Sequence, residues 1–178
     1  MATYPLLKVV LLGDGNVGKT SLARRYCEGM FEESRIMTIG VDFQTKVVGM
    51  PEGTVKLSIW DVAGQPHFKV VREGFYRGSL SAALVYDMTQ PSTLANLLGW
   101  IEEVQQYAPN VKFAVIGNKV DLVPPGTSVG GEEFAHSLGV PHLLTSAKDG
   151  LGVEQMFVDL ARLAVNLPLD VTYNDGGG

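Results

Sequence analysis

The stretch that decides the fold is residues 13–20, which read Gly13-Asp14-Gly15-Asn16-Val17-Gly18-Lys19-Thr20. An almost continuous apolar run precedes it, Leu6-Leu7-Lys8-Val9-Val10-Leu11-Leu12, and such a run predicts a strand that is buried on both faces. The residues that follow, Ser21-Leu22-Ala23-Arg24-Arg25-Tyr26, contain no helix breaker and can continue as a helix. Strand, glycine-rich loop and helix form the context that the pattern G-x-x-x-x-G-K-[ST] requires.

The residue types in this stretch suit a bound phosphate. Glycines let backbone N–H groups turn inward around an anion, and the N-terminus of the following helix adds partial positive charge. Lys19 can reach the β- and γ-phosphates of a nucleotide, and the hydroxyl of Thr20 can bind Mg²⁺. The alternative is a glycine-rich turn that binds nothing, which the flanking elements argue against. We expect the nucleotide to contact Asp14, Gly15, Asn16, Val17, Gly18, Lys19, Thr20 and Ser21.

Length and composition indicate one globular domain. The chain has 178 residues, of which 46% are hydrophobic and 19% charged, so it can bury a substantial core. Its net charge of −5 does not favour binding to nucleic acid, and the single cysteine, Cys27, excludes an internal disulfide and fits a reducing compartment. We expect the domain to cover residues 1–170 and a flexible C-terminal tail to cover residues 171–178.

Hydrophobic patterns predict the remaining elements. Residues 28–40 have no clean period and are expected to form a long functional loop. Alternating runs at residues 41–47 and 55–60, joined by a turn at residues 51–53 and ending at Asp61, predict a hairpin. Apolar runs predict strands at residues 82–86, 113–116 and 140–144, and helical periods predict helices at residues 94–104, 131–138 and 153–167. This alternation predicts a mostly parallel sheet with helices on both faces and ligands at the carboxyl ends of its strands.

A second motif, D-x-x-G, occurs at the end of the hairpin as Asp61-Val62-Ala63-Gly64. A carboxylate at this point can hold Mg²⁺, directly or through water. The N–H group of Gly64 can sense the γ-phosphate that GTP has and GDP lacks. The alternative is an ordinary junction between a strand and a turn, so this motif alone is weak.

A third motif, Asn118-Lys119-Val120-Asp121, follows a predicted buried strand. A carboxylate only accepts hydrogen bonds, so Asp121 can take two of them from the N1 and N2 donors of guanine. Adenine has no such pair of donors and would leave the carboxylate desolvated and unpaired. The alternative is a polar loop at the end of a strand, whereas the functional interpretation predicts selection of guanine.

A fourth motif, Ser146-Ala147-Lys148, offers a backbone N–H group to O6 of guanine, and alone it carries almost no information. All four motifs, however, occur in order along the chain, each at the C-terminal end of a predicted strand. This coincidence makes the combination specific. The sequence therefore predicts a guanine-nucleotide site.

With these motifs, residues 6–167 resemble the Ras-superfamily small GTPases, most closely the Rab branch. Further likeness lies in Ile39-Gly40-Val41-Asp42-Phe43, Trp60-Asp61 and Tyr76-Arg77-Gly78. The resemblance implies an α/β fold of the P-loop NTPase class, a G domain with a six-stranded, mostly parallel sheet, one antiparallel edge strand and five flanking helices. It also implies binding of GTP and GDP with Mg²⁺, slow hydrolysis, and two switch regions at about residues 31–40 and 63–76.

The resemblance also implies roles for individual residues. Phe31 is expected to pack against the guanine base, Thr38 to supply a second hydroxyl to Mg²⁺ and report the γ-phosphate, and Gln65 to orient the attacking water. The expected metal ligands are Thr20, Thr38 and Asp61. Beyond the phosphate loop, the expected nucleotide contacts are Phe31, Thr38, Gly64, Asn118, Lys119, Asp121, Ser146, Ala147 and Lys148.

The implied partners are proteins that recognise the switch regions. Phe43, Trp60 and an aromatic residue at Phe75 or Tyr76 resemble the Rab surface that contacts effectors. The alternative is ordinary packing on a half-buried hairpin. An exchange factor and a GTPase-activating protein are further implied partners. We expect no binding to nucleic acid, and we expect the protein to be a monomer.

Two departures from the Rab pattern affect these expectations. Rab proteins carry a glutamate after the switch II glutamine, which usually assists nucleotide exchange, whereas this chain has Pro66 followed by His67. Pro66 also biases Gln65 toward extended backbone angles. Rab proteins end in prenylated cysteines, but Cys27 lies in the first helix and the tail is acidic. We expect no intrinsic membrane anchor in this chain, and a cytoplasmic protein that reaches membranes through partners.

These observations predict a Rab-like molecular switch that hydrolyses GTP, with a place in membrane trafficking. A second interpretation stays open at this point, a GTP-dependent scaffold with negligible hydrolysis. Gln65 and Thr38 favour the switch, and Pro66 gives the scaffold some weight.

Arg35 adds a hypothesis about the rate of hydrolysis. It stands three positions before Thr38, where Rab and Ras proteins often have an aromatic residue. Heterotrimeric G-protein α subunits resemble this chain in having arginine at that spacing, where it acts in cis on the transition state. A guanidinium can give two parallel hydrogen bonds to phosphate oxygens. The alternative is a solvated loop arginine.

If Arg35 is catalytic, unassisted hydrolysis is faster than that of Ras, because charge developing on the phosphates meets a cation of the same chain. Ras turns over at roughly 10⁻⁴ to 10⁻³ s⁻¹, against about 10⁻² s⁻¹ with a cis arginine. Single-turnover hydrolysis by the parent and by Arg35→Ala, with GTP affinity measured alongside, tests this. A parent rate in the Ras range that the substitution leaves unchanged would show that Arg35 is only a surface charge.

Overall fold

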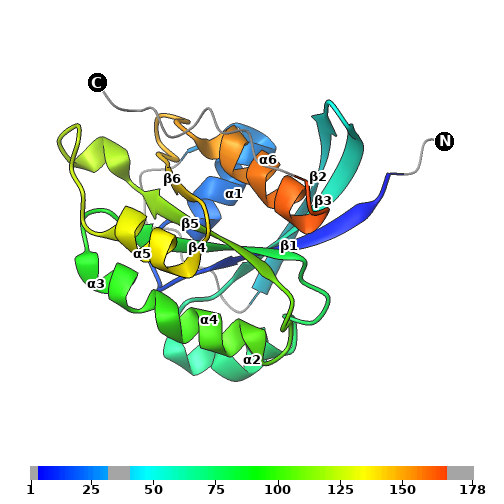
Figure 1. The fold of residues 1–178 in the computed structure, drawn as a ribbon, viewed down its shortest axis with the longest axis horizontal. Coiled ribbons are helices and arrows are strands. Elements are labelled where there is room, and N and C mark those ends of the chain that lie inside the picture. Colours follow the sequence, from blue (N-terminus) through cyan, green and yellow to red (C-terminus); the bar gives the residue numbers. More distant parts are fainter. Residues whose placement is uncertain (1–3, 32–40, 168–178) are drawn as a thin grey trace.

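The computed structural model describes residues 4–31 and 41–167, and six strands within them form one sheet in the order β2-β3-β1-β4-β5-β6. The strands are β1 (Leu6–Leu12), β2 (Val41–Met50), β3 (Gly53–Val62), β4 (Ser81–Asp87), β5 (Lys112–Asn118) and β6 (His142–Leu144). Figure 1 shows the sheet running through the middle of the molecule with helices on both sides.

β1 lies at the centre of the sheet, parallel to both of its neighbours. Val10 pairs with Trp60 of β3 on one side and with Ala82 of β4 on the other. β5 and β6 continue the parallel part, and β2 is antiparallel to β3 at the edge. The expected sheet, mostly parallel with one antiparallel edge strand, is confirmed. Because the five parallel strands end at one edge, the loops that follow them gather there.

The helices are α1 (Lys19–Glu28), α2 (Lys69–Glu73), α3 (Pro91–Ala95), α4 (Leu97–Gln105), α5 (Gly131–Leu138) and α6 (Val153–Ala164). α1 and α6 cover one face of the sheet, and the other helices cover the opposite face (Figure 1). α3 and α4 are separated only by Asn96, so together they occupy the place of one helix among the five that we expected. Over the described ranges, no helix combines the length and apolarity that crossing a bilayer requires.

Several element boundaries differ from the sequence-based prediction. The strand predicted at residues 140–144 covers only His142–Leu144, and the helix predicted at residues 153–167 ends at Ala164. β3 does not end at Asp61 but continues to Val62, because its ladder with β2 extends to the pair Val41 and Val62. The helix predicted over residues 94–104 is interrupted at Asn96, a residue type that favours helix ends over helix interiors. The hydrophobic pattern shows neither the extended pairing of β2 with β3 nor the break at Asn96.

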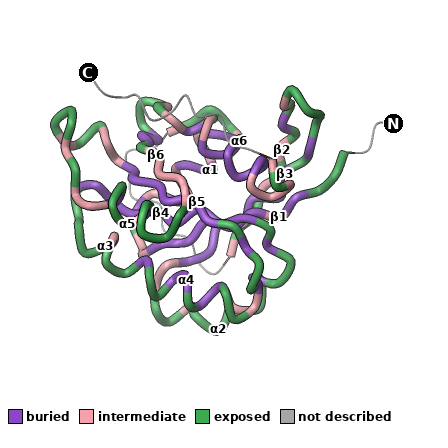
Figure 2. The backbone as a smooth tube through the Cα atoms, viewed as in Figure 1, coloured by how far each residue is buried: buried purple, intermediate pink, exposed green. Residues whose placement is uncertain are grey.

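Each face of the sheet carries its own core, and Figure 2 shows the central strands as buried tubes between helices that are exposed on their outer sides. On one face, the ring of Phe157 from α6 stacks on Tyr26 from α1 with centroids 4.3 Å apart. On the other face, Leu97 and Val104 of α4 pack over β4, whose seven residues are all buried. Burial of both faces explains why β1 and β4 are apolar along most of their length.

Replacing Phe157 by alanine should lower the free energy of unfolding by about 3–5 kcal/mol, because the ring is fully buried and its removal leaves a cavity beside Tyr26. Urea denaturation measures the change. Leu151→Ala is the matched control, since Leu151 is 59% exposed and its truncation should change stability by less than about 0.5 kcal/mol. Equal effects of the two substitutions would contradict the assigned core.

Candidate nucleotide-binding site

The residues after β1 turn tightly into α1. Gly13 and Gly18 have φ angles of 144° and 102°, which a side chain would strain. A Cβ atom at Gly13 would also stand 2.3 Å from the carbonyl oxygen of Val85. Gly18 precedes the first turn of α1, whose leading backbone N–H groups have no partner within the helix. The loop therefore has the shape and the donors of an anion site, as the motif predicted.

Lys19, the first residue of α1, folds back over this loop. Its Nζ donates hydrogen bonds to the carbonyl oxygens of Gly13, at 2.7 Å, and of Asp14, at 2.9 Å. Burial lowers the pKa of Lys19 to about 8, although the carboxylates of Asp61 and Asp14 oppose the shift. The loop thus holds a poorly solvated ammonium, which an incoming phosphate can satisfy better than neutral carbonyls can.

Thr20 and Asp61 bring two oxygen ligands together beside the loop. The hydroxyl of Thr20 donates a hydrogen bond to a carboxylate oxygen of Asp61. Asp61 is buried in β3, opposite Leu11 of β1, so the pairing of these two strands fixes its position. Oxygen ligands of this kind suit Mg²⁺. Thr20 and Asp61 therefore fit a magnesium ion, and the third expected ligand, Thr38, lies outside the described residues.

The residues after Asp61 lie against the phosphate loop. A Cβ atom at Gly64 would stand 2.5 Å from the carbonyl oxygen of Gly13 and 2.5 Å from the backbone nitrogen of Gly15, so only glycine fits there. The side-chain amide of Gln65 lies 3.5 Å from the position that a Cβ atom of Gly15 would take. Its Oε1 is buried and has no hydrogen-bond partner within the part of the chain that the structure describes. A buried acceptor without a partner suits a water molecule or a ligand donor at this point.

Asn118 bonds the third motif to the first. Its Nδ2 donates a hydrogen bond to the carbonyl oxygen of Val17 at 3.0 Å, and its Oδ1 accepts one from Thr145 at 3.0 Å. The same Nδ2 would lie 2.3 Å from a Cβ atom at Gly18, a second reason for glycine in the loop. Asn118 therefore acts as a brace between loops, with one hydrogen bond at each end of its side-chain amide.

Lys119 makes a second bond to the phosphate loop. Its Nζ donates to the carbonyl oxygen of Asn16 at 2.6 Å and lies 3.0 Å from a carboxylate oxygen of Asp87. Both Asn16 and Lys119 have left-handed backbone angles, with φ of 70° and 68°. Sequence reasoning missed Asp87, although a carboxylate at the end of the fully buried β4 was a usable signal.

The fourth motif meets the third at Asp121. The hydroxyl of Ser146 donates to Oδ1 of Asp121 at 2.9 Å and accepts a hydrogen bond from the backbone N–H of Asp149 at 3.0 Å. The carbonyl oxygen of Lys148 accepts one from Arg25 of α1 at 3.3 Å. These bonds orient the carboxylate that was predicted to recognise guanine, and they make Ser146 a support for Asp121.

Asp14 is held by residues that the sequence did not single out. Its Oδ1 accepts a hydrogen bond from the indole nitrogen of Trp100 at 2.9 Å, and its Oδ2 accepts one from Asn96 at 2.6 Å. Both donors come from the α3–α4 segment, more than 80 positions along the chain. No local sequence pattern links positions so far apart. Trp100 also fits the apolar period of its helix, so the sequence indicates only a core residue there.

The remaining expected site residues take no part in the contacts described above. Arg35 and Thr38 lie outside the described residues. Phe31, expected beside the guanine base, is partly buried against the core formed by α1 and α6. Ser21 lies in the first turn of α1, directly after Thr20.

An aromatic surface is formed by Phe43 of β2, Trp60 of β3 and Phe75, which follows α2. The rings of Phe43 and Trp60 stack with centroids 5.0 Å apart, and Trp60 lies 5.5 Å from Phe75. Phe43 is 56% exposed and Phe75 is 38% exposed, whereas Tyr76 is fully buried. The third member of the trio is therefore Phe75. Phe43, Trp60 and Phe75 therefore form a cluster of adjacent rings that is partly open to solvent.

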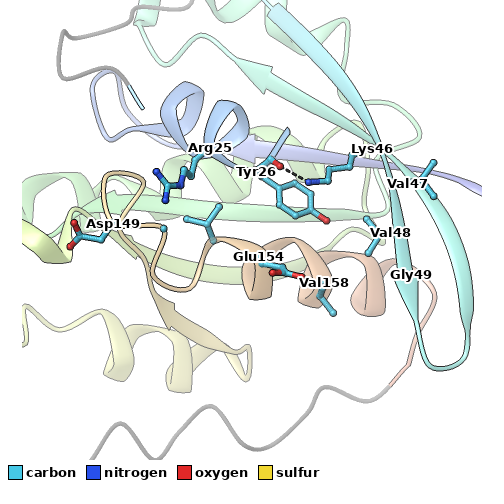
Figure 3. Close-up of a pocket in the computed structure, with 11 residues that line it drawn as sticks. Arg25, Tyr26, Lys46, Val47, Val48, Gly49, Asp149, Glu154 and Val158 are labelled. Atoms are coloured by element: carbon cyan, nitrogen blue, oxygen red, sulfur yellow. Dashed lines mark hydrogen bonds between the residues drawn. The ribbon is translucent and has the colours of Figure 1, made fainter. Parts of the chain in front are cut away.

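A separate hollow of about 460 Å³ lies between α1, β2 and α6, lined by none of the four motifs (Figure 3). Lys46 closes part of it, because its Nζ donates to the carbonyl oxygen of Tyr26 at 2.5 Å and lies 4.1 Å from the centre of that ring. Arg25, Asp149 and Glu154 add one further cation and two carboxylates to the wall. The hollow therefore offers no single sign of charge to a ligand.

Comparison with known proteins agrees with the geometry of the site. The model of the Ras family matches residues 8–166. The Ras-related protein Rab-1D of Dictyostelium discoideum is 39% identical over 167 residues, which cover 92% of this chain and 82% of that protein. The family match spans the six strands almost completely and includes all four motifs. The chain therefore belongs to the Ras family and is a Rab-like small GTPase, a molecular switch that binds guanine nucleotide and hydrolyses GTP.

Proposed function

We propose that the four motifs hold GTP or GDP together with Mg²⁺ at the carboxyl edge of the sheet. The observation that carries the proposal is the set of direct bonds from later motifs to the phosphate loop: Thr20 to Asp61, Asn118 to Val17, and Lys119 to Asn16. Ser146 of the fourth motif bonds in turn to Asp121 of the third. These bonds connect the four motifs to one another and support a single nucleotide site.

Individual residues take distinct parts in this proposal. Lys19 and the backbone N–H groups of the loop neutralise the phosphates, and Thr20, Thr38 and Asp61 hold the metal, Asp61 directly or through water. Bound Mg²⁺ supplies positive charge to the phosphate oxygens of the transition state. Asp121 selects guanine, with Ser146, Ala147 and Lys148 beside the base. Catalytic roles fall to Lys19, Arg35, Thr38 and Gln65, with Gln65 orienting water.

The scaffold alternative rested on Pro66. The residue does fix an extended backbone at Gln65, with φ −73° and ψ 139°, and yet the Gln65 side chain lies beside Gly15 of the phosphate loop. Membership of the Ras family adds further support for hydrolysis. We therefore keep the hydrolysing switch as the function.

The partners in this proposal are effectors that read switch I, switch II and the surface of Phe43, Trp60 and Phe75. An exchange factor and a GTPase-activating protein act on the same switches, and the altered residue Pro66 implies a modified route of exchange. We place the protein in the cytoplasm as a monomer, at membranes through its partners, with a role in membrane trafficking. Exposed stacked rings support the effector surface, because such rings dominate the binding energy of many interfaces.

Asp121→Asn should weaken binding of GDP by roughly 100-fold or more, because an amide presents a donor where the two guanine N–H groups need an acceptor. Xanthosine diphosphate should bind the variant better than it binds the parent. Equilibrium titrations with both nucleotides measure the change. Glu132→Gln, which neutralises an exposed carboxylate on α5, is the control. Parent-like GDP affinity in Asp121→Asn would refute the guanine assignment.

Nucleotide binding should take up a proton at alkaline pH. In the free protein, burial lowers the pKa of Lys19 to about 8, so the side chain is charged at pH 7 and mostly neutral at pH 9. Phosphates beside it favour the ammonium and raise its pKa, so binding at pH 9 adds up to one proton. Calorimetric titration with GDP in two buffers of different ionisation enthalpy measures the uptake. No increase in uptake from pH 7 to pH 9 would contradict a phosphate contact by Lys19.

A further inference from the structure

Arg72 of α2 is a buried arginine with an unusual set of partners. Its side chain belongs to switch II, yet the residue is only 5% exposed, and its partner Glu103 on α4 is 7% exposed. Nε and Nη2 of Arg72 donate to the two carboxylate oxygens of Glu103 at 2.7 and 2.8 Å. This paired geometry leaves the third nitrogen, Nη1, for other acceptors.

That third nitrogen holds the backbone on both sides of Gly64. Nη1 of Arg72 donates to the carbonyl oxygen of Gln65 at 2.8 Å and to that of Ala63 at 3.3 Å. One guanidinium thus ties the Ala63–Gln65 segment to α4. Because the carboxylate of Glu103 occupies the other two nitrogens, the guanidinium plane cannot rotate without breaking the buried pair.

The surroundings of Arg72 extend this contact to the phosphate loop. Its guanidinium lies 4.5 Å from the centre of a Trp100 ring, and the indole nitrogen of Trp100 donates to Asp14. Tyr76 adds a hydroxyl that donates to Glu103. A continuous path of buried or half-buried contacts therefore joins Asp14, Trp100, Arg72 and the Gln65 backbone.

Pro66 constrains the same backbone from the other side. It fixes extended angles at Gln65, and the backbone N–H of Phe68 donates to the Gln65 carbonyl oxygen at 3.1 Å. The carbonyl oxygen of Gln65 is thus bonded by both Arg72 and Phe68. With its carbonyl held and its angles restricted, Gln65 has little backbone freedom left, and its side chain stays beside Gly15.

We propose that Arg72 is a positioning residue for GTP hydrolysis, which holds the carbonyl oxygens of Ala63 and Gln65 and so keeps the Gln65 side chain against the phosphate loop. The inference rests on the proposed role of Gln65 in orienting the attacking water. Within the described residues, the hydrogen bonds of Arg72 go to Ala63, Gln65 and Glu103, none of which belongs to the phosphate loop or to the residues assigned to guanine. Its loss should therefore slow hydrolysis and leave GTP affinity almost unchanged.

Two variants separate positioning from simple support of the fold. Arg72→Lys keeps a cation for Glu103, but a single ammonium cannot reproduce the fork that bonds Glu103 and two backbone carbonyls together. Arg72→Met combined with Glu103→Gln removes both charges and leaves no unpaired ion in the core, so the fold is retained while the bond to Gln65 is lost. Lys69→Ala is the control, because Lys69 is exposed on the same helix and pairs only loosely with Glu73, at 3.8 Å.

The experiment measures single-turnover GTP hydrolysis, GTP affinity and thermal midpoint for the parent, these three variants and Gln65→Leu. We expect Arg72→Lys and the double variant to hydrolyse GTP about 10- to 100-fold more slowly, with GTP affinity changed less than about twofold. Gln65→Leu should be slowed at least as much, and Lys69→Ala should match the parent.

Three results would overturn the inference in different ways. Parent-like hydrolysis by both Arg72 variants, with Gln65→Leu slowed, would show that Gln65 is catalytic and that Arg72 does not position it. Parent-like hydrolysis by Gln65→Leu would refute the proposed role of Gln65 itself, and the inference about Arg72 with it. The third result is a hydrolysis rate that changes only together with the thermal midpoint. If both are low in Arg72→Lys and both return to the parent values in the double variant, Arg72 merely supports the fold.

Discussion

The parallel pairing of β1 with both β3 and β4 is the constraint on which the rest of the site depends. Leu11 lies between Asp61 of β3 and Ala83 of β4, so the ends of all three strands leave the sheet at the same edge. The central strands are hydrogen-bonded on both sides and buried on both faces, and they cannot slide without exposing apolar side chains and breaking the ladder. This rigidity sets Asp61 beside Thr20.

The phosphate loop is shaped by two requirements that act together. The turn from β1 into α1 needs backbone angles that glycine adopts without strain, and the carbonyl of Val85 and the amide of Asn118 leave no room for a Cβ atom at Gly13 or Gly18. The same compactness buries Lys19 and removes water from its ammonium. The desolvation cost of this cation is therefore met on folding, which favours the proposed contact of Lys19 with a phosphate.

The α3–α4 segment is more than a cover for the sheet. Trp100 contributes its ring to the core and its indole N–H to Asp14, and Glu103 forms the buried pair with Arg72. The phosphate loop and switch II therefore share one support. In this arrangement Pro66 is consistent with a hydrolysing site, because the extended backbone that it imposes on Gln65 is the one that Arg72 and Phe68 bond.

The sequence by itself determined the strands, their mostly parallel arrangement, the phosphate loop and the four motifs, because apolar period, glycine spacing and strand ends are properties of neighbouring residues. The roles of Arg35 and Thr38 stay predictions from sequence. Tertiary structure alone decided the extension of β3 to Val62, the choice of Phe75 over Tyr76 as the exposed ring, and the contacts of Asp14 with Trp100 and of Arg72 with Glu103. The physical reason is distance along the chain: these features depend on contacts between residues far apart in the sequence, which strand pairing and the packing of helices on the sheet bring together.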